Sequence, residues 1–245
     1  MALKFVDQAD LQGKKVLLRV DFNVPLNKDD SNQIADTSRV DLALPTIKTI
    51  LDKNPEKLII MSHMGRPKGK PVEKFSLEPV ARYLAGLINE EVLLTESCLD
   101  SGIKNLLTLN KPKVILLQNL RYHAEEEKND KEFASQLASY ADIYVNDAFG
   151  AAHRKHASTY MINGFFKNKA YAGHLFVKEV EALSNIIESP KKPFVGIIGG
   201  AKVSDKIKTI EKLLVMVDKL IIGGAMAYPF LKARDIEVGT SLAQK

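Results

Sequence analysis

Short runs of apolar residues recur along the chain, each about as long as a β-strand. Most are rich in Val, Ile and Leu, and few alternate between apolar and polar positions. This pattern is typical of strands covered on both faces in a parallel sheet. The runs are 16–20, 58–61, 92–94, 114–117, 143–145, 195–198 and 220–222.

Between these runs lie segments whose apolar residues recur at helical spacing. In the segment 38–53 the spacing is four, three and four positions, at Val40, Leu44, Ile47 and Leu51. Its N-cap candidates are Asp36, Thr37 and Ser38. Similar patterns predict helices over 77–88, 131–140 and 204–217. Strands and helices that alternate this often predict an α/β fold with a doubly wound, Rossmann-like parallel sheet.

A change of pattern near residue 173 predicts a division of the chain. The segment 163–172 is loop-like, 175–187 carries a helical stripe, and Pro190 and Pro193 end that helix. We therefore expect a first domain over 1–172, a connector helix over 173–192, and the start of a second α/β domain over 193–245. The alternative interpretation is one more crossover helix within a single sheet.

Composition narrows the class of protein. Among the 245 residues, 35 Lys and Arg against 30 Asp and Glu give a net charge of +5, and 45% are hydrophobic. The single cysteine, Cys98, cannot form an intramolecular disulfide, and no apolar stretch approaches the ~18 residues of a membrane span. We expect a cytoplasmic protein without a membrane partner. Dispersed lysines and only 7% aromatic residues argue against a nucleic-acid partner.

Polar side chains follow four of the predicted strands, where open parallel sheets bind their ligands. Three of these strand ends carry an arginine with a histidine nearby. The candidate residues are Asp21, Asn23, His63, Arg66, Arg121 and Arg154, with Arg39 just inside the first helix as a further cation. Guanidinium groups suit bidentate binding of phosphate or carboxylate, so a small and highly anionic ligand is expected. We take His63 as the functional histidine and interpret His123, His156 and His174 as surface or capping residues.

Glycine-rich turns follow the two strands predicted beyond residue 193. Such turns let backbone amides approach a phosphate at a helix N-terminus. The first contains Gly199 and Gly200 and leads to Lys202 and Lys206, four positions apart and expected on one helical face; the second begins at Gly223. Neither turn matches G-x-x-x-x-G-K-[ST], and no G-x-G-x-x-G follows a strand.

The motifs together resemble the phosphoglycerate kinase family. Segment 15–25, KVLLRVDFNVP, resembles its N-terminal signature. Three segments are similar to its substrate loops: 62–67 (SHMGRP), 119–123 (NLRYH) and 149–154 (FGAAHR). Segment 199–206, GGAKVSDK, is similar to its first nucleotide loop. The motifs occur in order from residue 15 to residue 225, so the resemblance covers nearly the whole chain.

The resemblance implies a monomeric glycolytic enzyme that transfers a phosphoryl group between 1,3-bisphosphoglycerate and MgADP, giving 3-phosphoglycerate and MgATP. It assigns Asp21 and Asn23 to the hydroxyl and carboxyl region of the glycerate. It assigns four residues to the phosphate end that is not transferred, namely His63, Arg66, Arg121 and Arg154. It assigns Arg39, Lys202 and Lys206 to the phosphoryl group during its transfer. It assigns the nucleotide site to Gly200, Ala201, Lys202, Lys206, Gly223 and Gly224.

The resemblance also implies how the parts cooperate. The first domain would bind phosphoglycerate and the second ADP or ATP, with a hinge closure joining them. Mg²⁺ would arrive with the nucleotide, and no metal site of the protein's own is expected. No nucleophile or base is needed, because the protein has to position two anions and neutralise charge.

This chain departs from the family pattern in three places. Gln118 stands where a glutamate is usual, and Ala225 replaces a third glycine; neither change removes a ligand. The family's Asn-Gly-Pro segment and Gly-Gly-Asp-Thr/Ser turn do not occur. We therefore expect catalysis to require a C-terminal half beyond residue 245. The alternative is a stand-alone phosphoglycerate-binding fragment without kinase activity.

Overall fold

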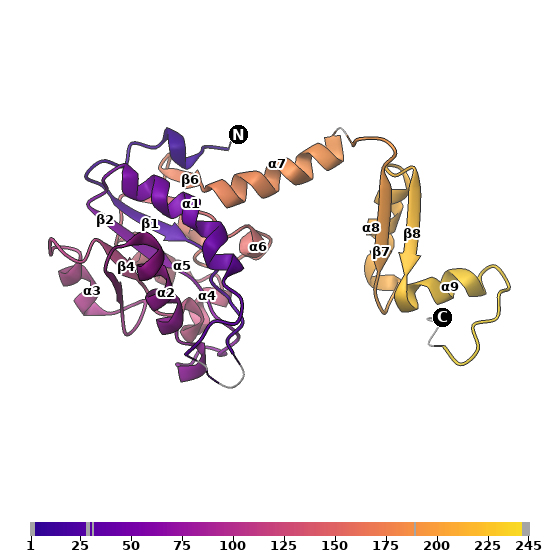
Figure 1. Ribbon diagram of the computed structural model, residues 1–245, viewed down its shortest axis with the longest axis horizontal. Helices are drawn as coiled ribbons and strands as arrows, with labels where there is room; N and C mark the ends of the chain where they lie inside the picture. The colour runs from indigo at the N-terminus through magenta and orange to yellow at the C-terminus, as the bar shows by residue number, and fades with distance from the viewer. Residues whose placement is uncertain (1–2, 28–29, 31, 189, 242–245) are drawn as a thin grey trace. The chain divides into compact units, whose positions relative to one another are not determined.

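The computed structural model describes residues 3–27, 30, 32–188 and 190–241 (Figure 1). The chain divides into two compact units, one up to Glu179 and one from Val180 onward. The division falls within the helix α7 (His174–Glu188). Each unit is described by itself below.

The first unit is built on one sheet of six parallel strands in the order β3-β4-β2-β1-β5-β6. The strands are β1 (Lys15–Arg19), β2 (Lys57–Met61), β3 (Val92–Leu94), β4 (Val114–Leu116), β5 (Ile143–Asn146) and β6 (Ala170–Ala172). From β1 the chain moves to β2 on one side, while β5 lies on the other side of β1. The boundary between β1 and β5 is thus the point where the strand order reverses, and the loops at the carboxyl ends diverge there.

Helices cover both faces of this sheet, and two separate cores result. Alternate residues of β1 illustrate the division, since Leu18 points into one core and Leu17 into the other. The first core is closed by α1 (Ser38–Asp52) and α2 (Glu78–Ile88). The second is closed by α3 (Ser101–Leu106) and α5 (Lys131–Ala138). The central strands are therefore buried on both faces, as their continuous apolar runs predict.

Short elements connect these helices and strands in the first unit. Two are single-turn helices, α4 (Ala124–Glu127) and α6 (Phe149–Ala152). Four are 3₁₀ turns: η1 (Val6–Gln8), η2 (Glu73–Phe75), η3 (Leu120–Tyr122) and η4 (Met161–Phe165). At the start of α1 the N-cap residue is Thr37, but the side chain that bonds the helix backbone is Asp36, which accepts from Ser38 N at 2.8 Å.

The second unit contains two parallel strands, β7 (Val195–Gly199) and β8 (Lys219–Gly223). They are followed by η5 (Ser204–Lys206) with α8 (Ile207–Leu214), and by η6 (Gly224–Met226) with α9 (Ala227–Lys232). Its core is small and consists of Ile198, Ile210 and Met226 with partly buried neighbours.

The α/β class with a parallel sheet is confirmed, and each predicted strand has its counterpart within one or two residues. Three predictions are wrong in detail. The segment 163–172 is not merely a loop, because it contains β6. The helix predicted over 204–217 begins as a 3₁₀ turn and ends at Leu214. Strand β7 is not covered on both faces, since Ile198 is buried while Ile197 is 77% exposed.

Among the described residues, no helix combines the length and the apolar character needed to cross a membrane.

Candidate functional site

The four strand ends singled out in the sequence belong to the four adjacent central strands, β4, β2, β1 and β5. All of these strands are parallel, so the loops that follow them leave the same edge of the sheet. Figure 1 labels β1, β2 and β4 in this unit, together with the helices that flank the sheet. The residues brought to this edge are Asp21 and Asn23 after β1, His63 and Arg66 after β2, Arg121 after β4, and Arg154 after β5.

Asp21 lies at the centre of the best-defined contacts. Its Oδ2 accepts a hydrogen bond from Nη1 of Arg39 at 2.5 Å, and its Oδ1 lies 3.8 Å from Nδ1 of His63. The side chain of Arg39 is 48% exposed, whereas that of His63 is 7% exposed. The structure thus brings three predicted site residues together from the β1 loop, the first turn of α1 and the β2 loop.

His63 lies among cations in a buried position. Burial is the largest cause that lowers its pKa, followed by the positive charges of Arg19 and Arg121, with smaller contributions from His156 and Arg39. A protonated imidazole is disfavoured when it is buried away from water and lies next to other cations. His63 is therefore neutral.

The loops after β1, β2 and β4 are tied to one another through backbone groups. The Asn23 side chain accepts from Gly65 N at 2.8 Å, and Arg121 Nη1 donates to Gly65 O at 2.9 Å. Asn119 bonds both the amide and the carbonyl of Met64. Gly65 has φ +60°, and an added Cβ would meet the Phe75 ring at 2.3 Å. A side chain at position 65 is disfavoured on both counts.

The three remaining arginines differ in their surroundings. Arg121 is 5% exposed, and its Nε lies 3.3 Å from Glu127 Oε1. Burial lowers the pKa of Arg121, the Glu127 carboxylate opposes this shift, and the charge of Arg154 adds to it. Arg66 is exposed and makes no hydrogen bond or ion pair within the part of the chain that the structure describes. Arg66 is thus free to meet a ligand.

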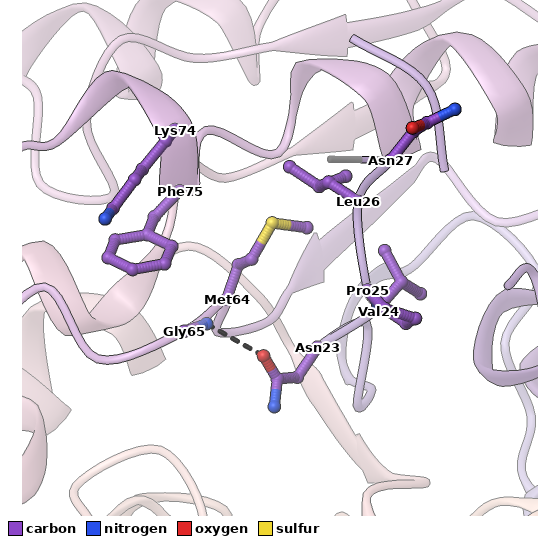
Figure 2. A pocket seen from close by; sticks show the side chains of 9 residues that line it. All are labelled: Asn23, Val24, Pro25, Leu26, Asn27, Met64, Gly65, Lys74 and Phe75. Atoms are coloured by element: carbon purple, nitrogen blue, oxygen red, sulfur yellow. Dashed lines mark hydrogen bonds between the residues drawn. The ribbon is translucent and has the colours of Figure 1, made fainter. Parts of the chain in front are cut away.

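A pocket of about 360 Å³ opens beside this edge, between the loops that follow β1 and β2. Figure 2 shows the Asn23–Gly65 hydrogen bond at its end and mainly apolar walls. The lining residues are Asn23, Val24, Pro25, Leu26, Asn27, Met64, Gly65, Lys74 and Phe75. The arginines named above are not among these lining residues, so the pocket lies beside the arginines and not between them.

In the second unit the two glycine turns pack against each other. Gly200 O accepts a hydrogen bond from Met226 N at 3.0 Å, and Gly224, with φ +66°, lies so close that an added Cβ would be 3.2 Å from Gly200 O. Lys206 lies next to the first of these turns, because its Cε is 3.3 Å from a Cβ built on Gly200. Ala201, Lys202 and Lys206 are exposed.

The prediction that Lys202 and Lys206 share one helical face is wrong. Lys202 lies in the loop before η5, and the α-helix begins only at Ile207. The turn after β7 is longer than a direct strand-to-helix junction, because residues 200–203 are neither strand nor helix.

Sequence reasoning missed a set of buried polar residues behind the site. Arg19, Glu126 and Ser158 are all fully buried and joined by hydrogen bonds. His156 is 8% exposed and 3.8 Å from Glu126, so it is not the surface residue that was expected. The one signal in the sequence was Arg19, a charge within an otherwise apolar strand.

Comparisons with known proteins agree with the pattern of motifs. The family model described as phosphoglycerate kinase matches residues 6–245. A phosphoglycerate kinase of Anaeromyxobacter sp. (strain Fw109-5) is 53% identical over 248 residues, which cover 100% of this chain and 62% of the relative. One of Prochlorococcus marinus (strain MIT 9312) is 48% identical, with 100% and 60% covered.

Solved structures give the same result. The structure of phosphoglycerate kinase from Coxiella burnetii superposes with a TM-score of 0.85 at 39% identity, covering 100% of this chain and 60% of that one. That of Pyrococcus horikoshii OT3 superposes with a TM-score of 0.78 at 30% identity, covering 97% and 59%. The chain spans about three fifths of the length of the proteins it matches.

Proposed function

Since this chain belongs to the phosphoglycerate kinase family, we propose that it carries the substrate-binding residues for phosphoryl transfer between 1,3-bisphosphoglycerate and MgADP. The products are 3-phosphoglycerate and MgATP. The observation that carries the proposal is the meeting of Asp21, Arg39 and His63 at one sheet edge. In this proposal residues 1–172 form the phosphoglycerate-binding domain, 173–192 the connector, and 193–245 part of the nucleotide-binding domain.

The site suits a small phosphorylated hydroxy acid. The Asp21 carboxylate is an acceptor for the ligand hydroxyl, and Asn23 lies two residues further along the same loop. Arg66, Arg121 and Arg154 supply planar, permanently charged donors for the phosphate that is not transferred. Neutral His63 adds a hydrogen-bond donor without adding a further charge.

The reaction requires that the two substrates be positioned and that the negative charge on the transferred group be neutralised. An oxygen of the ADP β-phosphate attacks the acyl phosphate, the P–O bond to the acyl group breaks, and 3-phosphoglycerate leaves as a carboxylate. Charge spreads over the transferred group in the transition state, so fixed cations stabilise it. We assign this role to Arg39 in the first unit and to Lys202 and Lys206 in the second.

The nucleotide side of the proposal rests on the glycine turns. Gly200, Ala201, Gly223 and Gly224 would line the phosphates of MgADP, because glycine lets backbone amides approach closely. Mg²⁺ enters with the nucleotide as part of the substrate. A closing movement of the two domains would exclude water from the transferred group, which strengthens the electrostatic contribution of the cations.

A second function has one observation in its favour. The substrate-binding residues of the proposal all belong to the first unit, which has two hydrophobic cores of its own. The 245-residue chain would then bind phosphoglycerate without transferring phosphate.

One sample distinguishes these functions. The 245-residue chain is titrated with 3-phosphoglycerate by calorimetry and then assayed for ATP formation from 1,3-bisphosphoglycerate and MgADP. Binding that weakens with added salt, without ATP formation, supports the second function for this chain, and ATP formation supports transfer. An absence of 3-phosphoglycerate binding at low salt contradicts both.

A further inference from the structure

A fully buried arginine lies directly behind the candidate site. The guanidinium of Arg19 donates from Nε to Ser158 Oγ at 2.9 Å, from Nη1 to the carbonyl oxygen of Val20, and from Nη2 to Nδ1 of His63 at 3.2 Å. Its side chain is 0% exposed. No ligand can reach Arg19 directly, and any effect on binding must pass through a neighbour.

The charge of Arg19 is balanced inside the protein. Glu126 is 0% exposed; its Oε2 accepts from Ser158 N at 2.9 Å and its Oε1 from Ser158 Oγ at 2.6 Å. The single hydroxyl hydrogen of Ser158 is therefore used toward Glu126, and its oxygen accepts from Arg19. This donor order fixes the guanidinium in place between Ser158 and His63.

Arg19 also decides which ring nitrogen of His63 carries the proton. A guanidinium has five donors and no acceptor, so Nδ1 of His63 has to accept and cannot itself be protonated. The competing carboxylate oxygen of Asp21 lies 3.8 Å from Nδ1, beyond hydrogen-bond distance. The proton of the neutral ring is left on Nε2, which has no hydrogen-bond partner among the residues that the structure describes.

We infer that Arg19 is a positioning residue that holds His63 as the neutral Nε2–H tautomer, so that His63 presents a fixed hydrogen-bond donor to the anionic ligand. The inference deepens the proposed function and rests on it for the identity of the ligand. The tautomer itself follows from contacts within the protein. Neither Arg19, Ser158 nor Glu126 was given a role by the sequence motifs.

The surroundings of His63 keep this donor independent of pH. The charged and titratable groups that face it are Arg19 on β1, Asp21 in the following loop, Arg39 on α1, Arg121 on η3, and His156 after α6. Four of the five are basic, and burial adds to their effect in lowering the pKa of His63. An unshielded histidine would titrate near its ordinary value of about 6.5.

Long-range ¹H–¹⁵N correlation spectra of the ¹⁵N-labelled 245-residue chain test the tautomer without any ligand. The His63 signals are assigned by their loss in His63→Gln. We expect an unprotonated Nδ1 and a protonated Nε2 that do not change from pH 5 to pH 8. A protonated Nδ1, or a titration within that range, would overturn the inference whether or not any variant folds.

A pair of variants tests the role of Arg19. Arg19→Met/Glu126→Gln removes the buried cation together with its buried counter-charge, so that neither is left unpaired. Glu126→Gln alone is the matched control and retains Arg19. We expect His63 to populate both tautomers in the double variant and only the Nε2–H tautomer in the control. A His63 that stays locked in a folded double variant would contradict the role.

Binding of 3-phosphoglycerate supplies the functional readout. We expect the double variant to bind with a dissociation constant several-fold higher than the control at pH 7, because a ring that populates both tautomers presents the Nε2–H for only part of the time. Equal dissociation constants in the two variants would contradict the positioning role. A wild-type chain that binds no 3-phosphoglycerate would contradict the proposed function and leave the tautomer result standing.

Discussion

Asp21 and Arg39 form an ion pair, with Arg39 Nη1 2.5 Å from Asp21 Oδ2. The pair joins the loop after β1 to the first turn of α1, and Arg39 keeps nearly half of its side chain exposed. A partly exposed guanidinium held by one carboxylate oxygen still has free donors for an incoming anion. The pair therefore holds Arg39 at the edge of the site.

We predict that Arg39→Ala lowers turnover far more than affinity. In protein that forms ATP, kcat should fall about 10²–10³-fold, because a fixed cation stabilises the transition state more than the ground state. The KM for 3-phosphoglycerate should change by less than about threefold. Steady-state kinetics measure both, and Arg82→Ala, an exposed arginine on α2 that pairs with Glu78, is the control. Comparable losses in kcat and affinity would contradict the assignment of Arg39 to the transferred group.

Arg66 and Arg121 should separate ligand binding from stability. Arg66 is exposed and unpaired within the described ranges, so Arg66→Gln should weaken 3-phosphoglycerate binding about tenfold and leave the unfolding midpoint unchanged. Arg121 is buried and bonds Gly65 O, so Arg121→Gln should weaken binding and also lower the free energy of unfolding by about 2 kcal/mol. Calorimetric titration and thermal unfolding check both changes. Equal unfolding midpoints for the two variants would argue against the structural role of Arg121.

At neutral pH the first unit should be less stable with Asp147 than with asparagine at position 147. The side chain is fully buried, its Oδ1 accepts from Phe176 N at 3.0 Å near the start of α7, and its Oδ2 has no partner among the described residues. Burial raises the pKa of Asp147, against opposing hydrogen bonds from Thr46 and the α7 backbone. When the pKa of a carboxyl group is higher in the folded than in the unfolded state, its protonated form stabilises the folded protein. This stabilisation is lost as the pH rises from the pKa of the unfolded state to that of the folded state.

Asn at this position keeps the acceptor and carries no charge. Asp147→Asn should therefore be at least as stable as wild type at pH 7, with a difference that shrinks as the pH falls toward 4. Urea unfolding at pH 4, 5.5 and 7 measures it. Asp147→Ala, which also removes the acceptor, is the control and should be less stable than Asp147→Asn at every pH. An Asn variant that is least stable relative to wild type at pH 7 would refute the argument.

The elements most accessible to sequence reasoning were the buried ones. In the first unit the apolar runs mark the strands, because a strand covered on both faces has no polar side to interrupt it. Strand β6 was missed because Ala170, Tyr171 and Ala172 carry only a weak apolar signal and pair with β5 at an edge of the sheet. Strand β7 shows the opposite error. Its apolar run was interpreted as a sign that both faces are covered, but one face of the strand is exposed.

The site could be anticipated in outline for a topological reason. Parallel strands bring their carboxyl ends to one edge, so the residues after β1, β2, β4 and β5 meet whatever the side-chain details. The buried contacts of Arg19 could not be anticipated, because Ser158 and Glu126 lie 139 and 107 positions away and their partners depend on tertiary packing. The Lys202–Lys206 error arose because Lys202 lies in a loop and Lys206 in a 3₁₀ turn, so that neither belongs to the α-helix.

Gly223 and Gly224 are adjacent but should respond differently to an added methyl group. Gly223 is extended, with φ −116°, and a Cβ there meets nothing within 4 Å. Gly224 has φ +66°, and its Cβ would press on Gly200 O at 3.2 Å. Alanine at a left-handed position costs about 1–2 kcal/mol. We therefore expect Gly224→Ala to lower both the stability of the second unit and its affinity for MgADP, since the turn after β7 must shift.

Gly223→Ala is the matched variant, because its methyl group would project into the open space that we assign to the nucleotide. It should lower MgADP affinity and leave stability unchanged. Thermal unfolding and calorimetric titration with MgADP measure the two quantities for each variant. Unchanged MgADP affinity in both variants would remove the glycine turns from the nucleotide site. A loss of stability in Gly223→Ala would show that position 223 is packed against protein, which its open surroundings exclude.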